Sequence, residues 1–119
     1  MRLYEHESKK IVEQSGSPVP KQFGVVNAGN EIDGLKLELP VMIKAAVLVG
    51  GRGKAGGVKK ARTQEEVDKI AASLLELKIK DYPVERIFFE KAVDEVSACY
   101  LGVTTDPKTF NNVIVVSAA

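Results

Sequence analysis

A glycine-rich loop between two strand-like runs restricts the fold more than any other part of the sequence. The apolar run VMIKAAVLV at 41–49 leads into GGRGKAGG at 50–57, and a strand pattern resumes as GGVKKA at 56–61. Glycines let a backbone turn sharply and approach a ligand closely, because they carry no side chain. Since the loop leads back into a strand, it predicts a β-hairpin with a bare tip, and not the strand-to-helix turn of a dinucleotide-binding fold.

Three phosphate-binding templates can be compared with this loop. Residues 51–56 satisfy G-x-G-x-x-G, but Ala71 stands about twenty residues further on, where a dinucleotide fold needs a ribose-binding acid. A Walker A loop is excluded, because Leu48 and Ala55 replace its glycine and its serine or threonine. Residues 51–58 match the kinase pattern G-x-G-x-x-G-x-V, but no H-R-D or D-F-G follows. The loop therefore predicts backbone contacts with phosphates outside a kinase.

Positive charge gathers around the loop. Between Glu38 and Glu65 the sequence has no acidic residue, and the cations there are Lys44, Arg52, Lys54, Lys59, Lys60 and Arg62. Lys44 interrupts an apolar run, and a buried ammonium requires an anion or a carboxylate beside it. A triphosphate would supply that anion, and this is the interpretation we favour. The alternative is a solvated basic hairpin tip, with the Lys44 side chain reaching along the strand to water.

Composition limits the remaining classes of protein. The chain has 119 residues, 45% of them hydrophobic and 28% charged, with a net charge of +1, which is typical of one soluble globular domain or part of one. This balance gives no general attraction to nucleic acid or to anionic membranes. A charged N-terminus and the lack of a long apolar run predict a cytoplasmic protein without a signal peptide or a membrane span. A single cysteine, Cys99, excludes an internal disulfide, and its apolar neighbours predict a small buried hydrophobe.

Hydrophobic periodicity predicts an α+β fold with a mainly antiparallel sheet and two flanking helices. The first helix has an apolar stripe that includes Ile11 and Val12, and the second begins with a capping box formed by Thr63 and Glu66. The expected helices are 3–15, a short irregular one around 30–37, and 63–79. The expected strands are 21–26, 41–49, 56–61, 84–92, 96–105 and 111–119.

Six segments of the chain resemble one enzyme family. They are LYEHESK at 3–9, PVP at 18–20, Lys44, GGRGKAGG at 50–57, IFFEKAVD at 87–94 and YLGV at 100–103. Together they are similar to the N-terminal part of the β subunit of succinate–CoA ligases, which begins with an ATP-grasp domain. The likeness covers essentially the whole chain. It implies that residues 1–119 form the N-terminal part of an ATP-grasp domain, with the second half of the cleft and the CoA-ligase domain beyond them.

The resemblance implies nucleotide-binding roles for Lys44, Gly51, Arg52, Gly53, Glu90 and Val93. Lys44 would contact the ATP phosphates, and residues 51–53 would form a lid over them. Glu90 would lie beside the adenine, and the base edge would bond to the Val93 backbone. Without the resemblance, Glu90 is interpreted as an ordinary carboxylate at a strand end.

Two positions depart from the family pattern. Ala98 stands where the family has a ribose-binding glutamate, and Glu95 lies three positions earlier. The expected strand places Val96, Ala98 and Tyr100 on one face. His6 replaces a tyrosine of the family, and we expect a surface or packing variant, not a ligand.

For activity, the resemblance implies an ADP-forming ligase of the tricarboxylic acid cycle. ATP (or GTP) and Mg²⁺ would phosphorylate succinate by way of a histidine of the α subunit, and CoA would displace the phosphate. The metal-binding and catalytic residues would lie outside residues 1–119. We therefore expect the isolated chain to be inactive.

Three alternatives stay open at the level of sequence. The acid could be malate or acetate, because acid specificity would lie outside these residues. The chain could instead be a non-catalytic module that binds a partner subunit through the apolar run VIVVSAA at 113–119. Binding of RNA by the basic hairpin is disfavoured, because no aromatic side chains alternate with the cations.

Overall fold

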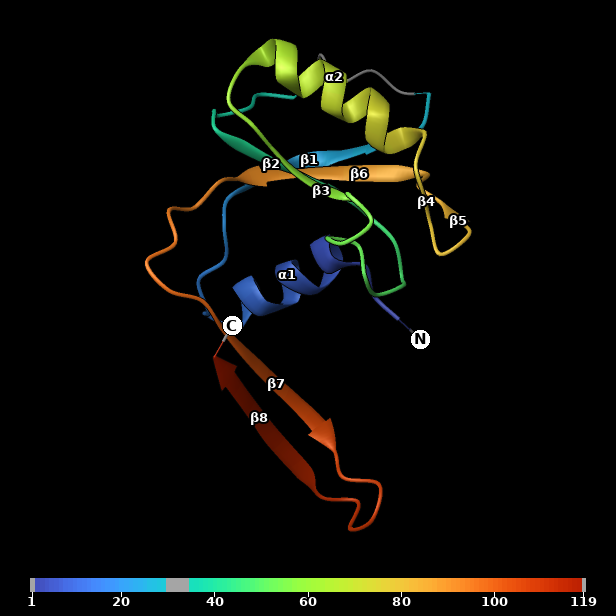
Figure 1. Ribbon diagram of the computed structural model, residues 1–119. Coiled ribbons are helices and arrows are strands. Elements are labelled where there is room, and N and C mark those ends of the chain that lie inside the picture. Colours follow the sequence, from blue (N-terminus) through green and yellow to red (C-terminus); the bar gives the residue numbers. More distant parts are fainter. Residues whose placement is uncertain (1, 30–34, 119) are drawn as a thin grey trace.

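The computed structural model describes residues 2–29 and 35–118, which form a four-stranded antiparallel sheet with a helix on each face (Figure 1). The strand order is β1 (Gln22–Asn27), β6 (Arg86–Lys91), β2 (Val41–Ala45) and β3 (Val58–Ala61). Helix α2 (Gln64–Leu75) covers one face, and α1 (Glu5–Gln14) lies against the other. The predicted α+β class is confirmed. The irregular helix predicted around 30–37 falls mainly on 30–34, outside the described residues.

The hydrophobic core lies between the sheet and α2. On α2, Val67, Ala71 and Leu74 are buried at the spacing of one helix face. They belong to a cluster that includes Ile43 of β2 and Phe89 of β6, both fully buried. Because side chains alternate along a strand, the neighbours of these two residues point to the face that α1 covers. The sheet therefore has one apolar face and one face available for a site.

The N-terminus of α2 has the predicted capping bonds with one change. The Thr63 hydroxyl accepts a hydrogen bond from the Glu66 N–H at 3.2 Å. The Glu66 carboxylate accepts from the N–H of Arg62 at 2.7 Å, one residue before the position that a capping box uses. The helix ends at Leu75 and not at residue 79, because residues 78–79 pair with a following strand.

Helix α1 does not pack on the sheet through its predicted apolar stripe. Ile11 and Val12 are 56% and 42% exposed. The buried residue of this helix is His6, and Glu5 and Lys9 are half-buried beside it. The predicted packing face is therefore wrong, and the face that meets the sheet is polar and charged.

Several strand boundaries differ from the prediction. β2 ends at Ala45, so residues 46–49 belong to the connection to β3 and not to the predicted strand. β7 (Cys99–Thr105) begins at residue 99, so Val96 and Ala98 precede it and do not share a strand face with Tyr100.

A short hairpin with strands of two residues each was not predicted from the sequence. It consists of β4 (Lys78–Ile79) and β5 (Tyr82–Pro83). Its turn uses Lys80 and Asp81, both at positive φ without a glycine, so the usual turn signal is absent.

β7 and β8 (Asn112–Ala118) form a hairpin that extends away from the sheet (Figure 1). The two strands contact chiefly each other, and apolar side chains such as Leu101, Val103 and Ile114 are about 70% exposed. Cys99 is exposed as well, so the prediction of a buried thiol is wrong. The apolar run predicted to bind a partner is exposed over the described residues 113–118.

Candidate functional site

The candidate site lies on the face of the sheet that α1 covers. In the pairing of β2 with β6, Lys44 stands opposite Phe88 and Met42 stands opposite Glu90. All four side chains therefore share one face, while Ile43 between them points to the core. The alternation of the two central strands thus places a lysine and a carboxylate side by side under α1.

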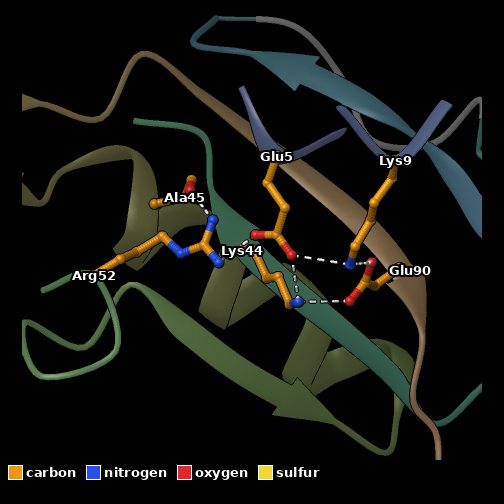
Figure 2. A network of polar contacts seen from close by, with 6 residues as sticks. All are labelled: Glu5, Lys9, Lys44, Ala45, Arg52 and Glu90. Carbon is orange, nitrogen blue, oxygen red and sulfur yellow. Dashed lines mark hydrogen bonds and ion pairs between the residues drawn. The ribbon is translucent and has the colours of Figure 1, made fainter. Parts of the chain in front are cut away.

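Four of the charged side chains form a ring of alternating sign, seen in Figure 2. Lys44 Nζ lies 2.9 Å from Glu5 Oε1 and 2.6 Å from Glu90 Oε1. Lys9 Nζ lies 2.9 Å from Glu5 Oε1 and 2.5 Å from Glu90 Oε2. Each ammonium thus contacts both carboxylates. Lys44, the lysine that interrupts an apolar run, therefore pairs with two carboxylates of the chain itself.

The glycine loop joins this ring through Arg52. Its guanidinium pairs with Glu5 Oε2 and donates to the Ala45 carbonyl at 3.2 Å. Gly57 leaves room for the Arg52 side chain, because a Cβ at residue 57 would come within 2.8 Å of the Arg52 Cγ. Glu5 therefore contacts three cations, supplied by α1, β2 and the loop.

The backbone of the loop is only partly used inside the protein. The N–H of Ala55 donates to the Gly51 carbonyl at 3.0 Å, and that of Gly57 donates to the Arg52 carbonyl at 2.8 Å. Among the described residues, the N–H groups of residues 52–54 donate to no backbone oxygen. Gly51 has a φ of 80°, which a non-glycine residue rarely adopts. The tip of the loop thus presents consecutive donors to an outside acceptor.

The ring of Phe88 forms the floor under the cations. Its centroid lies 6.0 Å from Lys9 Nζ, 5.8 Å from Lys44 Nζ and 5.8 Å from the Arg52 guanidinium. His6 packs on the same ring, with centroids 5.5 Å apart, and burial lowers the pKa of this histidine. His6 is therefore a packing residue of the site's floor. The aromatic face adds attraction for the cations that it carries.

Glu5 stays ionised well below neutral pH. Burial by itself would raise the pKa of its carboxyl group, but hydrogen bonds from Lys9 and Lys44 oppose burial. The charges of Arg52 and Lys44 act in the same direction, and the sum lowers the pKa of Glu5 from 4.5 to about 2. Burial likewise lowers the pKa of Lys9, but its hydrogen bonds to Glu90 and Glu5 outweigh burial and raise it. Both shifts favour the charged forms.

Acid should therefore weaken the fold through Glu5. A carboxyl group with a depressed pKa contributes stability above its unfolded pKa of 4.5, and loses it as the pH falls towards about 2. Because the side chain is partly exposed, we expect a loss on the order of 2 kcal/mol. Urea unfolding at pH 6 and pH 2.5 would measure it. The Glu5→Gln variant should lose less between the two pH values, and an equal loss in both proteins would contradict the assignment.

A cleft of about 600 Å³ opens beside the ring of charges. Its lining includes three of the predicted site residues, namely Lys44, Glu90 and Val93. The other lining residues are Lys9, Pro20, Met42, Val58, Lys60, Lys91, Ala92, Asp94 and Glu95. The predicted loop residues 51–53 do not line it, and Arg52 reaches Lys44 only through Glu5. Glu95 lines the cleft, whereas Ala98 does not.

Two residues of the site, Glu5 and Lys9, lie in segment 3–9, which carries part of the family resemblance, but neither was assigned a role from the sequence. Their spacing of four residues is that of an ordinary ion pair on a helix surface. A clearer signal would have been the charged character of α1 together with the single lysine in the apolar strand β2, because that lysine requires a carboxylate partner. Glu90, interpreted from the residues alone as a strand-end carboxylate, is 3% exposed.

The described residues contain neither a metal-binding cluster nor a membrane-spanning helix. Within residues 2–29 and 35–118, no three His, Cys, Asp or Glu side chains gather closely enough to hold a metal ion. No helix in the described part of the chain is both long and apolar enough to cross a membrane.

Comparison with known proteins gives one consistent family. The family described as "ATP-grasp domain" matches residues 2–119. The chain is 39% identical over 118 residues to the "Succinate--CoA ligase [ADP-forming] subunit beta" of Halorubrum lacusprofundi, covering 98% of this chain and 31% of that protein. It is 38% identical to the protein of the same name from Aquifex aeolicus, covering all of this chain and 33% of that one. The chain thus spans about a third of the length of these relatives.

A solved structure has the same fold. It is a dinucleotide forming acetyl-coenzyme A synthetase 1 from Ca. Korarchaeum cryptofilum, in complex with coenzyme A and Ca-AMPCP. The TM-score is 0.77 at 23% sequence identity, and the match covers 98% of this chain and 53% of that one. At this identity the likeness extends to the fold alone.

Proposed function

The chain belongs to the ATP-grasp domain family, and from this premise we propose that it forms one wall and the lid of the nucleotide site in an ADP-forming succinate–CoA ligase β subunit. The observation that carries the proposal is the cleft itself. It places Lys44, Glu90 and Val93 around one space, and the glycine loop is connected to Lys44 through Arg52 and Glu5. These are residues that the resemblance assigns to a nucleotide.

In this proposal different residues bind the phosphates and the base of the nucleotide. Lys44 and Arg52 bind the phosphates of ATP or GTP, and the free N–H groups of Gly53 and its neighbours close over them. Glu90 and the Val93 backbone contact the base. Glu95 lines the same cleft and is the carboxylate that we propose for the ribose, in place of the missing one at Ala98.

The complete enzyme would transfer the γ-phosphoryl group to a histidine of a partner α subunit and form succinyl-CoA from succinate and CoA. The cations of this chain would stabilise charge on the transferring group. Because no three metal-ligating side chains gather within the described residues, we assign no residue of this chain to Mg²⁺ and derive no step through it. The isolated 119 residues should bind ATP weakly, with a dissociation constant on the order of 1 mM, and should show no turnover.

Phosphate recognition can be tested by comparing ATP with adenosine. Lys44→Ala and Arg52→Ala should each weaken ATP binding about tenfold or more, because a charge-assisted contact with phosphate contributes roughly 1.5 to 3 kcal/mol. Adenosine has no phosphate and should bind as before. NMR titration of the full-length β subunit measures both constants.

The matched control is Lys69→Ala. It removes the same charge from an exposed position of α2, on the opposite face of the sheet, and should leave both constants unchanged. Equal losses for ATP and adenosine in Lys44→Ala would mean that the substitution damaged β2, and the phosphate assignment would be wrong.

A further inference from the structure

Glu5 occupies the cations to which the proposed function assigns a ligand's phosphates. Its carboxylate contacts Lys44 through one oxygen and Arg52 through the other. It also pairs with Lys9, so the carboxylate bridges three positive groups (Figure 2). A phosphate would present negatively charged oxygens to the same donors.

The position of Arg52 shows what binding would require. Its guanidinium is directed at Glu5 and at the Ala45 carbonyl, and it does not line the cleft. Lys44 does line the cleft. For one phosphate chain to contact both cations, it has to take the place of the Glu5 carboxylate, which lies between Arg52 and Lys44.

The two carboxylates of the ring differ in how easily they can be replaced. The Glu90 side chain is 4% exposed, and it holds both lysines from beneath. The Glu5 side chain is 27% exposed and lies on α1, which covers one face of the sheet. The more exposed Glu5 is therefore the carboxylate that an anion can replace, while Glu90, which lines the cleft but is almost fully buried, stays in place.

Building on the proposed function, we propose that Glu5 is an internal competitor for the phosphates: its carboxylate occupies their position in the ligand-free chain, and nucleotide binding exchanges one anion for the other. The exchange transfers Arg52, and with it the glycine loop, from Glu5 to the phosphates. Glu5 thus sets the affinity of the site for phosphate chains, and it holds the loop against α1 until one binds.

The test uses inorganic tripolyphosphate, which has the phosphate chain without the base. Glu5→Gln in the 119-residue chain should bind tripolyphosphate about tenfold more tightly than the parent, because the competing charge is gone. Adenosine affinity should not change. The control is Glu13→Gln, which removes an equal charge from an exposed position of the same helix and should leave the tripolyphosphate constant within about twofold of the parent.

A second variant separates contact from charge. Glu5→Asp keeps the carboxylate but shortens the side chain by one methylene, so it should release Arg52 and tighten tripolyphosphate binding to a lesser degree. It also keeps the net charge of the ring, which protects the fold if Glu5→Gln does not fold. Parental affinity in both Glu5→Gln and Glu5→Asp would overturn the competition.

The outcomes for the parent distinguish this inference from the proposed function. Binding of tripolyphosphate by the parent without any gain in either Glu5 variant would overturn the competition and leave the nucleotide site standing. Failure of the parent and all variants to bind ATP or tripolyphosphate would overturn both. Binding by a Glu5 variant alone would support the competition strongly.

Discussion

Replacement of Phe89 by alanine is expected to lower the free energy of unfolding by about 3 to 5 kcal/mol. The ring is fully buried between the sheet and α2, in the cluster that includes Ile43 and Leu74. These neighbours are held by a strand and a helix and cannot collapse into the space, so the loss includes a cavity as well as the lost burial. Urea unfolding followed by circular dichroism measures it.

The adjacent residue provides a matched comparison. Phe88 is equally buried, at 1% exposure, but its ring lies on the other face under Lys44 and Arg52. Phe88→Ala should therefore change tripolyphosphate affinity as well as stability. Phe89→Ala should change stability alone, provided that binding is measured where the variant is folded. A loss below about 1 kcal/mol for Phe89→Ala would show that the α2 face is not the main core.

The parts of the fold that were predicted correctly have local signals. The second helix has an apolar face and a capping residue within a dozen positions, and Thr63 caps it as expected. The antiparallel hairpin of β2 and β3 follows from two runs joined by a glycine loop. Each signal lies within one continuous segment of the chain, so it does not depend on distant residues.

The site depends on contacts between residues far apart in the chain, and local patterns cannot report them. Lys44 meets Glu5 at a separation of 39 residues, and Lys9 meets Glu90 at 81. A prediction from an apolar stripe assumes that the helix packs by burying its hydrophobic side chains. Helix α1 instead packs on opposite charges and an aromatic ring, so its stripe of Ile11 and Val12 predicted the wrong face.

Burial was overestimated in the C-terminal hairpin for a related reason. The apolar alternation around Cys99 predicts a strand, and β7 is a strand. Whether its side chains are buried depends on what covers them, and β7 and β8 contact chiefly each other. A pattern of residues predicts the capacity to be buried but not the surface that provides the burial.

Glu90→Gln is expected to destabilise the chain by about 3 kcal/mol, the lower end of the cost of removing one partner from a buried ion pair, because Glu5 still pairs with both lysines. Glu90 offers one oxygen to Lys44 at 2.6 Å and the other to Lys9 at 2.5 Å. A glutamine has one oxygen, and its NH₂ group would face the second ammonium. Thermal and urea unfolding of the variant beside the parent would measure the loss.

A second substitution tests whether the cause is the ammonium that faces the glutamine NH₂ group. In the double variant with Glu90→Gln and Lys44→Met, the glutamine oxygen can accept from Lys9, and no ammonium stands against the NH₂ group. We therefore expect the double variant to be more stable than Glu90→Gln alone by 1 kcal/mol or more, roughly the coupling expected between residues in contact. If the loss in the double variant equals the sum of the losses in Glu90→Gln and in Lys44→Met, each measured alone, Lys44 and Glu90 do not depend on each other. The ring of charges would then not be what holds α1 against the sheet.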